Sequence, residues 1–321
     1  MRPSHLIYDG STVYAQPAFR IMALVDMPLA DPVARQAMSV LLTDFLEIAA
    51  PRLELFARAG GKVKALKPET FSAKIVTKAR SMIDEGEWTW PSTLRFYGHF
   101  EEPHPSVAPP HLRFEQLHEY GCIQIELPLD PPCLDEAGLV AFSNRVQGHL
   151  AGLPVLWGVM GYGMFQPVSL ESLIWMLPRV TPRYRCAIEV QPDKAHRLLR
   201  RTQHMDELQA GTFPVMGLPD IGWRTIVGDV FRDRLPELEG LASQPGIRLA
   251  RGGSFTVVEA GPAPIWGDVN VDEDFALYRT VAAALKPCKP EWIRVRNGLF
   301  GGYENDNGLD RIEAWYERFE A

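Results

Sequence analysis

The stretches LPDIGWRTIVGD at residues 218–229 and EAGPAPIWGDVN at residues 259–270 decide how this chain is interpreted. Each combines the Gly, Pro and Asp residues of a specified turn with a tryptophan, Trp223 in the first and Trp266 in the second. Neither holds a nucleophile beside a base, a phosphate-binding glycine loop, or metal ligands at a productive spacing. We therefore expect a shaped recognition surface and no enzyme active site, with both tryptophans buried as core anchors behind the loops.

The length and composition are those of a large globular chain. Its 321 residues are 46% hydrophobic, which is ordinary for a folded protein and can support one large unit or two packed lobes. No apolar run approaches the ~18 residues needed to span a bilayer, and the first residues lack the apolar core of a signal peptide. The four cysteines are widely spaced, so buried free thiols in the cytoplasm are expected: Cys122, Cys133, Cys186 and Cys288.

The charge distribution argues against a nucleic-acid partner. The net charge is −7, and the segment 81–140 carries a strong acidic excess whereas 51–80 is basic. A protein that grips DNA usually has a basic excess. Such blocks are most often solvated faces that pair with each other. An acidic face can also attract a basic protein partner and speed its encounter.

Hydrophobic periodicity predicts alternating strands and helices. A helix is expected to begin at Asp31-Pro32 and to end at Gly60-Gly61, and Pro109-Pro110 is expected in an exposed loop. The pattern favours an α+β fold with a mixed, mainly antiparallel sheet or sheets flanked by helices. We expect a single unit over 1–321, with a possible N-terminal lobe at 1–165 and C-terminal lobe at 166–321. The expected strands are 18–25, 93–98, 121–127, 155–160, 185–190, 223–227, 247–250 and 255–258, and the further helices are 69–84, 135–150, 193–209, 229–241, 272–285 and 309–320.

The motifs that resemble catalytic or metal sites fail on spacing. The run from His118 to Cys122 resembles HExxH, but the second histidine is replaced and the pattern predicts a turn into a strand. His99, His104, His111 and His118 lie in a proline-rich context and are expected to be exposed loop residues. Residues 158–163 have glycines in the wrong order for a dinucleotide site. No catalytic residue, cofactor or metal is therefore expected.

Two groups of carboxylates are candidates for contact with a partner. Asp268, Asp272, Glu273 and Asp274 surround Gly267 and precede an expected helix, without the spacing of a calcium loop. One or two of them are expected to cap that helix, where the dipole favours negative charge, and the rest can face a partner. Glu101 and Glu102 form the second acidic group, on a loop bounded by prolines.

The two loop stretches resemble those of the bacterial type VI immunity family, formerly a domain of unknown function. Its members are encoded beside effectors that carry restriction-endonuclease-fold toxin domains. The resemblance spans most of 90–290, and its most specific part is the run Gly-Pro-x-Pro-x-x-Gly-Asp-Val-Asn at 261–270. The other matching residues are Phe213-Pro214, Gly217-Leu218-Pro219, Trp223-Arg224-Thr225, Gly228-Asp229, Tyr278, Leu285 and Pro287, together with the region from Tyr97-Gly98 to Leu127.

This resemblance implies an immunity protein that binds a cognate secreted nuclease toxin and blocks it without catalysis. It supplies no catalytic residues, and the matching positions are expected to be structural because contact residues diverge with the toxin. A nuclease cleft is basic and binds a divalent metal, so the acidic groups are our candidates for the toxin-binding surface. Two alternatives stay open: an enzyme with an unrecognised site, and an adaptor component of the secretion system.

Overall fold

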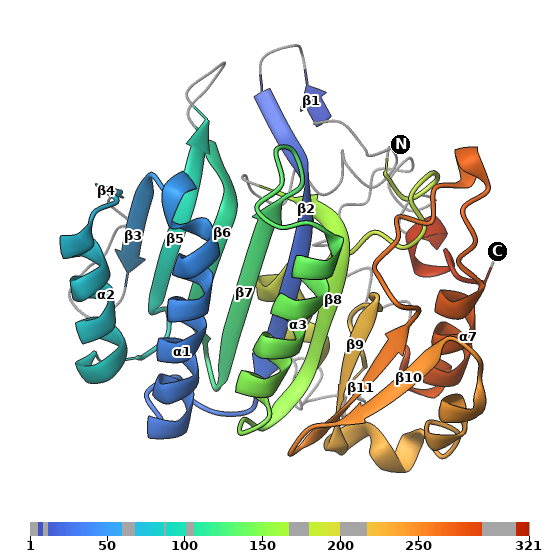
Figure 1. Cartoon of the computed structure of the whole chain (residues 1–321). Helices are drawn as coiled ribbons and strands as arrows, with labels where there is room; N and C mark the ends of the chain where they lie inside the picture. Colours follow the sequence, from blue (N-terminus) through green and yellow to red (C-terminus); the bar gives the residue numbers. More distant parts are fainter. Residues whose placement is uncertain are drawn as a thin grey trace, which may run out of the picture.

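A computed structural model describes residues 6–8, 12–59, 68–86, 88–100, 106–166, 180–199, 217–290 and 313–320. Their strands form one large sheet in which each strand pair is antiparallel (Figure 1). The strand order is β10-β11-β9-β8-β2-β7-β6-β5-β3-β4, and β1 pairs with β2 outside this path. The predicted α+β fold with a mainly antiparallel sheet is confirmed.

The centre of the sheet is formed by three long strands, β2 (Thr12–Val25), β7 (Tyr120–Pro128) and β8 (Val155–Phe165). β2 lies between the other two, so that Phe19 is opposite Leu127 on one side and Tyr162 on the other. From Ala15 to Val25 every residue of β2 is buried. This agrees with the nearly continuous apolar sequence, because a strand covered on both faces has no need of alternation.

Two wings extend from this centre. One contains β6 (Ser106–Leu117), β5 (Thr93–Phe100), β3 (Leu55–Ala59) and β4 (Glu69–Thr70). The other, which we call the C-terminal wing, contains β9 (Arg224–Gly228), β11 (Phe255–Ala260) and β10 (Ile247–Arg251). The short β1 (Leu6–Tyr8) lies beside β2. Because β8 pairs with both β2 and β9, strands from both expected lobes share the sheet, and the division at 165/166 stays a prediction.

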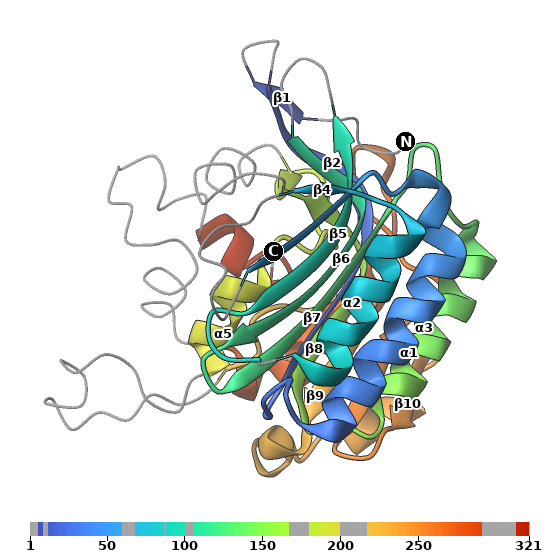
Figure 2. The ribbon, with the colours of Figure 1, turned by 90° about the vertical axis from the view of Figure 1, so that its left-hand side faces the viewer.

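Three helices cover one face of the sheet, as Figure 2 shows. They are α1 (Pro32–Ala49), α2 (Ala73–Glu85) and α3 (Glu136–Leu150). α1 begins as its sequence predicts, since the Asp31 side chain accepts a hydrogen bond from the Val33 amide and Pro32 occupies the first turn. Asp135 caps α3 in the same way through the Gly138 amide. The apolar faces of these helices close the main core.

The opposite face carries α5 (Pro192–Leu199), which packs on β2 and β7 (Figure 2). α7 (Ala276–Leu285) packs against β11 in the C-terminal wing. Among the described helices, none combines the length and apolarity required to cross a bilayer. Residues 313–316 form a helical turn within the predicted helix 309–320. The 3-10 segments are η1 (Ala50–Arg52), η2 (Asp229–Arg234), η3 (Glu239–Ser243), η4 (Val269–Val271) and η5 (Lys286–Cys288).

The end of the first helix was predicted wrongly. α1 ends at Ala49, and the chain turns through η1 into the unpredicted strand β3 well before Gly60-Gly61. Pro51 explains the early end, because a proline inside a helix removes a backbone donor and clashes with the preceding turn. The expected helix at 229–241 was also wrong, since η2 and η3 occupy that stretch as two separate 3-10 turns.

The expected exposed loop at Pro109-Pro110 is instead buried within β6. The register between β5 and β6 shifts at this point, where Tyr97 is opposite His111 but the next residue, Gly98, is opposite Ala108. A bulge of this kind leaves residues outside the ladder, so the missing amide donors of the two prolines cost little. The prediction of an exposed loop was therefore wrong, although the two prolines do lie where the strand ladder is interrupted.

The predicted strand at 185–190 is also absent. The segment runs as turns with two isolated bridges, Tyr184 to Asp268 and Ile188 to Gly163. Its apolar residues are buried, as expected of a strand, but its described pairing with the sheet is limited to Ile188, whose amide donates to the Tyr162 carbonyl of β8 at 2.9 Å. Three of the four cysteines are buried and Cys133 is partly buried, and all four are free thiols.

Candidate functional site

The two loop stretches meet in the C-terminal wing. The Trp223 indole nitrogen donates to the Gly261 carbonyl at 2.9 Å, which ties the first stretch to the second. The Trp266 ring stacks on Tyr162 with 5.2 Å between centroids. Trp223 has no exposed surface and Trp266 is 6% exposed. The prediction that both tryptophans are core anchors is confirmed.

Gly267 is required at its position for two reasons. Its φ of 63° is in the left-handed region, and a Cβ there would lie 2.7 Å from the Cys186 sulfur. The absence of a side chain lets the two segments approach, so that the Arg185 amide donates to the Gly267 carbonyl at 3.1 Å. The Cys186 amide likewise donates to the Trp266 carbonyl at 3.0 Å. The glycine of the motif is therefore structural.

Asp268, one of the predicted partner contacts, is only 2% exposed. Arg183 binds it in a bidentate pair, with Nε to Oδ1 at 2.9 Å and Nη2 to Oδ2 at 2.8 Å. The Asn270 amide also donates to Oδ1 at 3.1 Å. The hydrogen bond from Arg183 lowers the pKa of this carboxyl below its usual range. Asp268 thus holds the following loop from inside.

The loop 269–274, which we call the acidic loop, presents the other candidates at the surface. Asp272 and Asp274 are exposed and Glu273 is partly buried. Glu273 accepts a hydrogen bond from the Asp268 amide at 2.9 Å, and Asp274 accepts one from the Ala276 amide at the start of α7, also at 2.9 Å. Asp274 thus binds the first amide of α7, as expected of one of these acids, whereas the N-cap position itself is held by Phe275, which makes no side-chain cap. Glu101 and Glu102 lie outside the described residues.

A buried ion pair lies on the central strands. Arg20 of β2 donates through Nε to Glu126 of β7 at 2.8 Å and through Nη1 to the Ile188 carbonyl at 2.8 Å. Burial opposes ionisation of Glu126, but the charge of Arg20 and the hydrogen bond with His111 outweigh it and lower its pKa to about 2. Burial also lowers the pKa of His111, which favours a neutral ring at neutral pH. We therefore attribute the ionised state of Glu126 chiefly to Arg20.

A second buried carboxylate, Glu189, was not foreseen in the sequence. The Thr181 hydroxyl lies 3.0 Å and 3.1 Å from its two carboxyl oxygens. Burial raises the pKa of Glu189 to about 8, against the opposing charge of Arg318. The available signal was a lone acid within the apolar run 186–190. Its neighbour Asp220 pairs with Arg318 and accepts a hydrogen bond from the Glu189 amide at 3.4 Å.

The histidines divide between core and surface. His111, expected in an exposed loop, is buried in β6, with Nδ1 3.2 Å from Glu126; this prediction was wrong because Pro109-Pro110 lie in the sheet. His118 is exposed in the β6–β7 turn and stacks on Trp90 at 4.5 Å. His104 lies outside the described residues. Within the described ranges, no three His, Cys, Asp or Glu side chains gather as a metal site would require.

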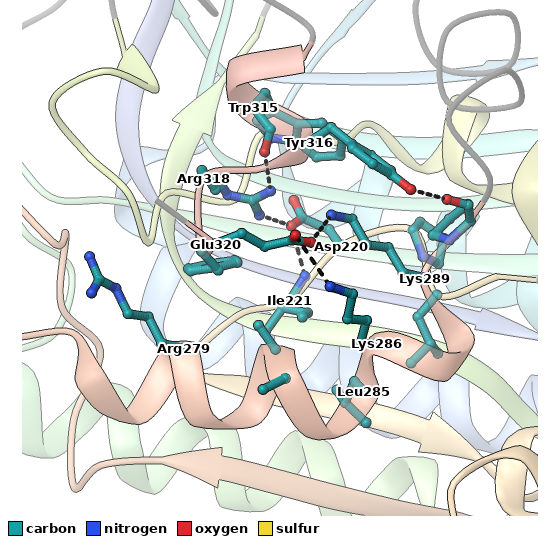
Figure 3. Close-up of a pocket in the computed structure, with 16 residues that line it drawn as sticks. Asp220, Ile221, Arg279, Leu285, Lys286, Lys289, Trp315, Tyr316, Arg318 and Glu320 are labelled. Carbon is teal, nitrogen blue, oxygen red and sulfur yellow. Dashed lines mark hydrogen bonds and ion pairs between the residues drawn. The ribbon is translucent and has the colours of Figure 1, made fainter.

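A cavity of about 350 Å³ opens beside the first loop stretch, as Figure 3 shows. Its described walls come from residues 218–221, α7, η5 and the segment 315–320. Lys286 and Lys289 both point at the Glu320 carboxylate, at 3.4 Å and 2.6 Å. Arg318 lies deeper, paired with Asp220. Glu189 is not among the described residues that line this cavity.

Comparison with known proteins identifies a solved structure that has the same fold. No family model and no curated protein matches the chain. Among solved structures, the same fold is found in a type VI secretion system (T6SS) protein. That structure is the Pseudomonas aeruginosa T6SS protein PA0821, which superposes with a TM-score of 0.73 and 16% sequence identity. The match covers 98% of this chain and 87% of that chain, so the two share a whole fold.

Proposed function

We propose that this chain is an immunity protein that binds and neutralises a cognate nuclease effector of a type VI secretion system. The observation that carries the proposal is the whole-chain fold shared with a T6SS protein. The loop stretches that resemble the type VI immunity family add the second support. The partner is a secreted nuclease toxin, and the chain needs no cofactor, nucleic acid or membrane for this role. Its place of action is the cytoplasm, where the substrate of such a toxin lies.

The mechanism we infer is occlusion of the nuclease cleft. A nuclease holds phosphates and a divalent metal in a basic cleft. The acidic loop offers carboxylates at Asp272, Glu273 and Asp274 that complement such a cleft and occupy the positions of phosphates. The exposed Val269 and Val271 lie between Asp268 and Asp272. They provide an apolar contact, which a tight interface needs in addition to charge complementarity.

Preorganisation of the acidic loop supports this mechanism. The bidentate contact between Arg183 and Asp268 fixes the start of the loop, and the Asp274 contact fixes its end at α7. A loop already held in one conformation loses less entropy on binding than a free one. Asp268 acts here as a positioning residue beneath the surface, whereas Asp272, Glu273 and Asp274 make the contact.

The alternatives make different demands. An enzyme needs a reactive group that is open to substrate. Glu189, whose pKa is raised to about 8, is buried beside Thr181 and is not among the described residues that line the cavity. An adaptor would bind several secretion components and leave nuclease activity intact. Co-purification with the effector encoded beside this chain's gene separates these roles, because an immunity protein forms a stoichiometric complex with that effector alone.

The binding surface is tested by reversing three charges. Asp272, Glu273 and Asp274 are changed together to Lys, and association with the effector is followed by stopped-flow or surface plasmon resonance at several salt concentrations. We expect the association rate constant of this variant to be lower by about tenfold or more. We also expect that it no longer rises when the salt concentration is lowered. The matched control reverses the exposed acids Asp233, Glu237 and Glu239, which changes net charge equally on another surface. Equal effects of the two triplets would remove the acidic loop from the interface.

A further inference from the structure

The cavity in the C-terminal wing has the dimensions of a ligand site. Its volume of about 350 Å³ is in the range of small-molecule sites, roughly 300–1,000 Å³. It lies between three stretches that are far apart in the sequence, 218–221, 279–290 and 315–320, which the hydrogen bonds around it hold together. The Leu218 amide donates to the Cys288 carbonyl at 2.8 Å, and the Tyr316 hydroxyl donates to the Pro290 carbonyl at 2.8 Å.

The walls of the cavity are mainly apolar. Leu218 and Leu285 line it together with the rings of Trp315, Tyr316 and Phe319. At its base, the Arg318 guanidinium lies between two of these rings, 4.6 Å from the Trp315 centroid and 4.4 Å from that of Phe319. Arg318 is paired there with the buried Asp220, so the base is close to neutral. An apolar body is therefore the part of a ligand that fits the interior.

The mouth of the cavity is positively charged. Lys286 and Lys289 share one carboxylate, Glu320, and the exposed Arg279 adds a third cation at the rim. In Figure 3 both lysines converge on Glu320, whereas Arg279 is directed away from it. Two ammonium groups offer six hydrogen-bond donors in total, of which one carboxylate satisfies only part. A second anion can therefore bind at the mouth without burying an unpaired charge.

We propose that this cavity binds a small organic carboxylate with an apolar body. Its head group lies between Lys286 and Lys289, and its body lies against Leu285, Trp315 and Phe319. The site is a small-molecule site beyond the toxin-binding role, and its occupation does not depend on that role.

Glu320 has a specific part in this proposal. It pairs with both lysines, and hence competes with the head group of the ligand for them. Lys289 and Lys286 lower the pKa of Glu320 through their hydrogen bonds and charges, in agreement with an ionised competitor. Neutralising Glu320 should strengthen binding of the carboxylate ligand. No such gain is expected if Glu320 and the two lysines form only a structural salt bridge.

The test uses isothermal titration calorimetry of the full chain with phenylbutyrate and octanoate, each compared with its neutral amide. We expect each carboxylate to bind at least about tenfold more tightly than its amide, since charge-assisted hydrogen bonds exceed neutral ones. Lys286→Met with Lys289→Met should remove this preference, and Glu320→Gln should raise affinity for the carboxylates severalfold. Ala282→Phe, which fills the cavity from α7, should weaken carboxylates and amides alike.

The matched control is Lys74→Met, at an exposed lysine of α2 on the other wing, which should bind as the unchanged chain does. Circular dichroism and thermal melting verify that each variant is folded. The proposal is overturned by equal affinity for carboxylate and amide, by unaltered binding in the double lysine variant, or by no saturable binding of either carboxylate at millimolar concentration. A loss of affinity in Glu320→Gln would also contradict it. None of these measurements involves the effector, so the outcome is separate from the immunity proposal.

Discussion

Arg20 is the residue on which the centre of the sheet depends. Its side chain has no exposed surface. Its guanidinium contacts Glu126 on β7 and the Ile188 carbonyl in the turn segment 185–190. Removing a charge from water is costly, and the cost is met only while its partner is present. The pair joins residues that are opposite each other on β2 and β7, and it adds less net stability than an apolar pair of the same size could.

The first prediction follows from that pair. Glu126→Gln leaves the Arg20 charge uncompensated in the core, and we expect the free energy of unfolding to fall by about 3 kcal/mol, at the lower end for a broken buried pair. Urea denaturation followed by circular dichroism measures it. The control is Glu47→Gln, whose partner Arg145 lies at the surface, where loss of a pair costs at most about 1 kcal/mol. Equal losses in the two variants would refute the structural importance of the buried pair.

The second prediction concerns Glu189 and pH. Its pKa is about 8 in the folded chain, where burial favours the neutral form, against the ordinary 4.5. The folded state therefore binds the extra proton between these values, and the contribution of this group to stability is fully present below pH 4.5 and is lost as pH rises through 8. Glu189→Gln removes the titration, so its stability relative to the unchanged chain should increase steadily over this window.

Urea denaturation at a series of pH values tests this, with the exposed Glu237→Gln as control. Parallel pH profiles for the unchanged chain and Glu189→Gln would show that Glu189 is ionised in the folded state and would contradict the prediction.

At the scale of elements, the turn at Gly267 positions the acidic loop. Its left-handed φ and the close approach of Cys186 exclude a side chain. For Gly267→Ala we expect a destabilisation of about 1–3 kcal/mol, the cost of a strained backbone with a clash. The matched control is Gly240→Ala in η3, where an added Cβ meets nothing within 4 Å and the change should be neutral or slightly stabilising. Thermal melting compares the two, and an equal effect would show that the Gly267 geometry is unimportant.

Elements with strong periodicity could be predicted from the sequence. The strands β2, β7, β8, β9 and β11, the helix α3 and the start of α1 lie close to their predicted positions, because apolar spacing and Asp caps are local signals. The strand expected at 185–190 and the loop expected at Pro109-Pro110 were wrong for a shared reason. Burial and strand pairing depend on segments distant in sequence, and neither apolar runs nor prolines report them.

The candidate site shows the same limit. The burial of Trp223 and Trp266 was predictable from the size and apolar character of tryptophan. The burial of Asp268 was not, because its partner Arg183 lies 85 residues away in the sequence. Glu189 was missed as well, since nothing near it in the sequence reveals the Thr181 and Asp220 contacts. The exposure of Asp272 and Asp274 agrees with their assignment as surface candidates, and their role in binding stays a prediction.

At the scale of the whole molecule, one antiparallel sheet carries two different surfaces. Helices α1, α2 and α3 cover one face, and the C-terminal wing presents the acidic loop and the basic mouth of the cavity. The two features have opposite charge and lie at the two ends of α7, since the acidic loop leads into Ala276 and Lys286 follows Leu285. In our two proposals, a protein partner with a basic cleft binds at the first end and a small organic anion binds at the second.

We propose above that this chain inhibits a nuclease toxin. The most direct measurement is cleavage of nucleic acid by the toxin domain encoded beside this chain's gene, assayed with increasing amounts of the purified chain. We predict that cleavage is abolished at a one-to-one ratio and is restored when Asp272, Glu273 and Asp274 carry reversed charges. Full nuclease activity in the presence of excess chain would contradict the immunity role, while leaving the fold and the cavity proposal unaffected.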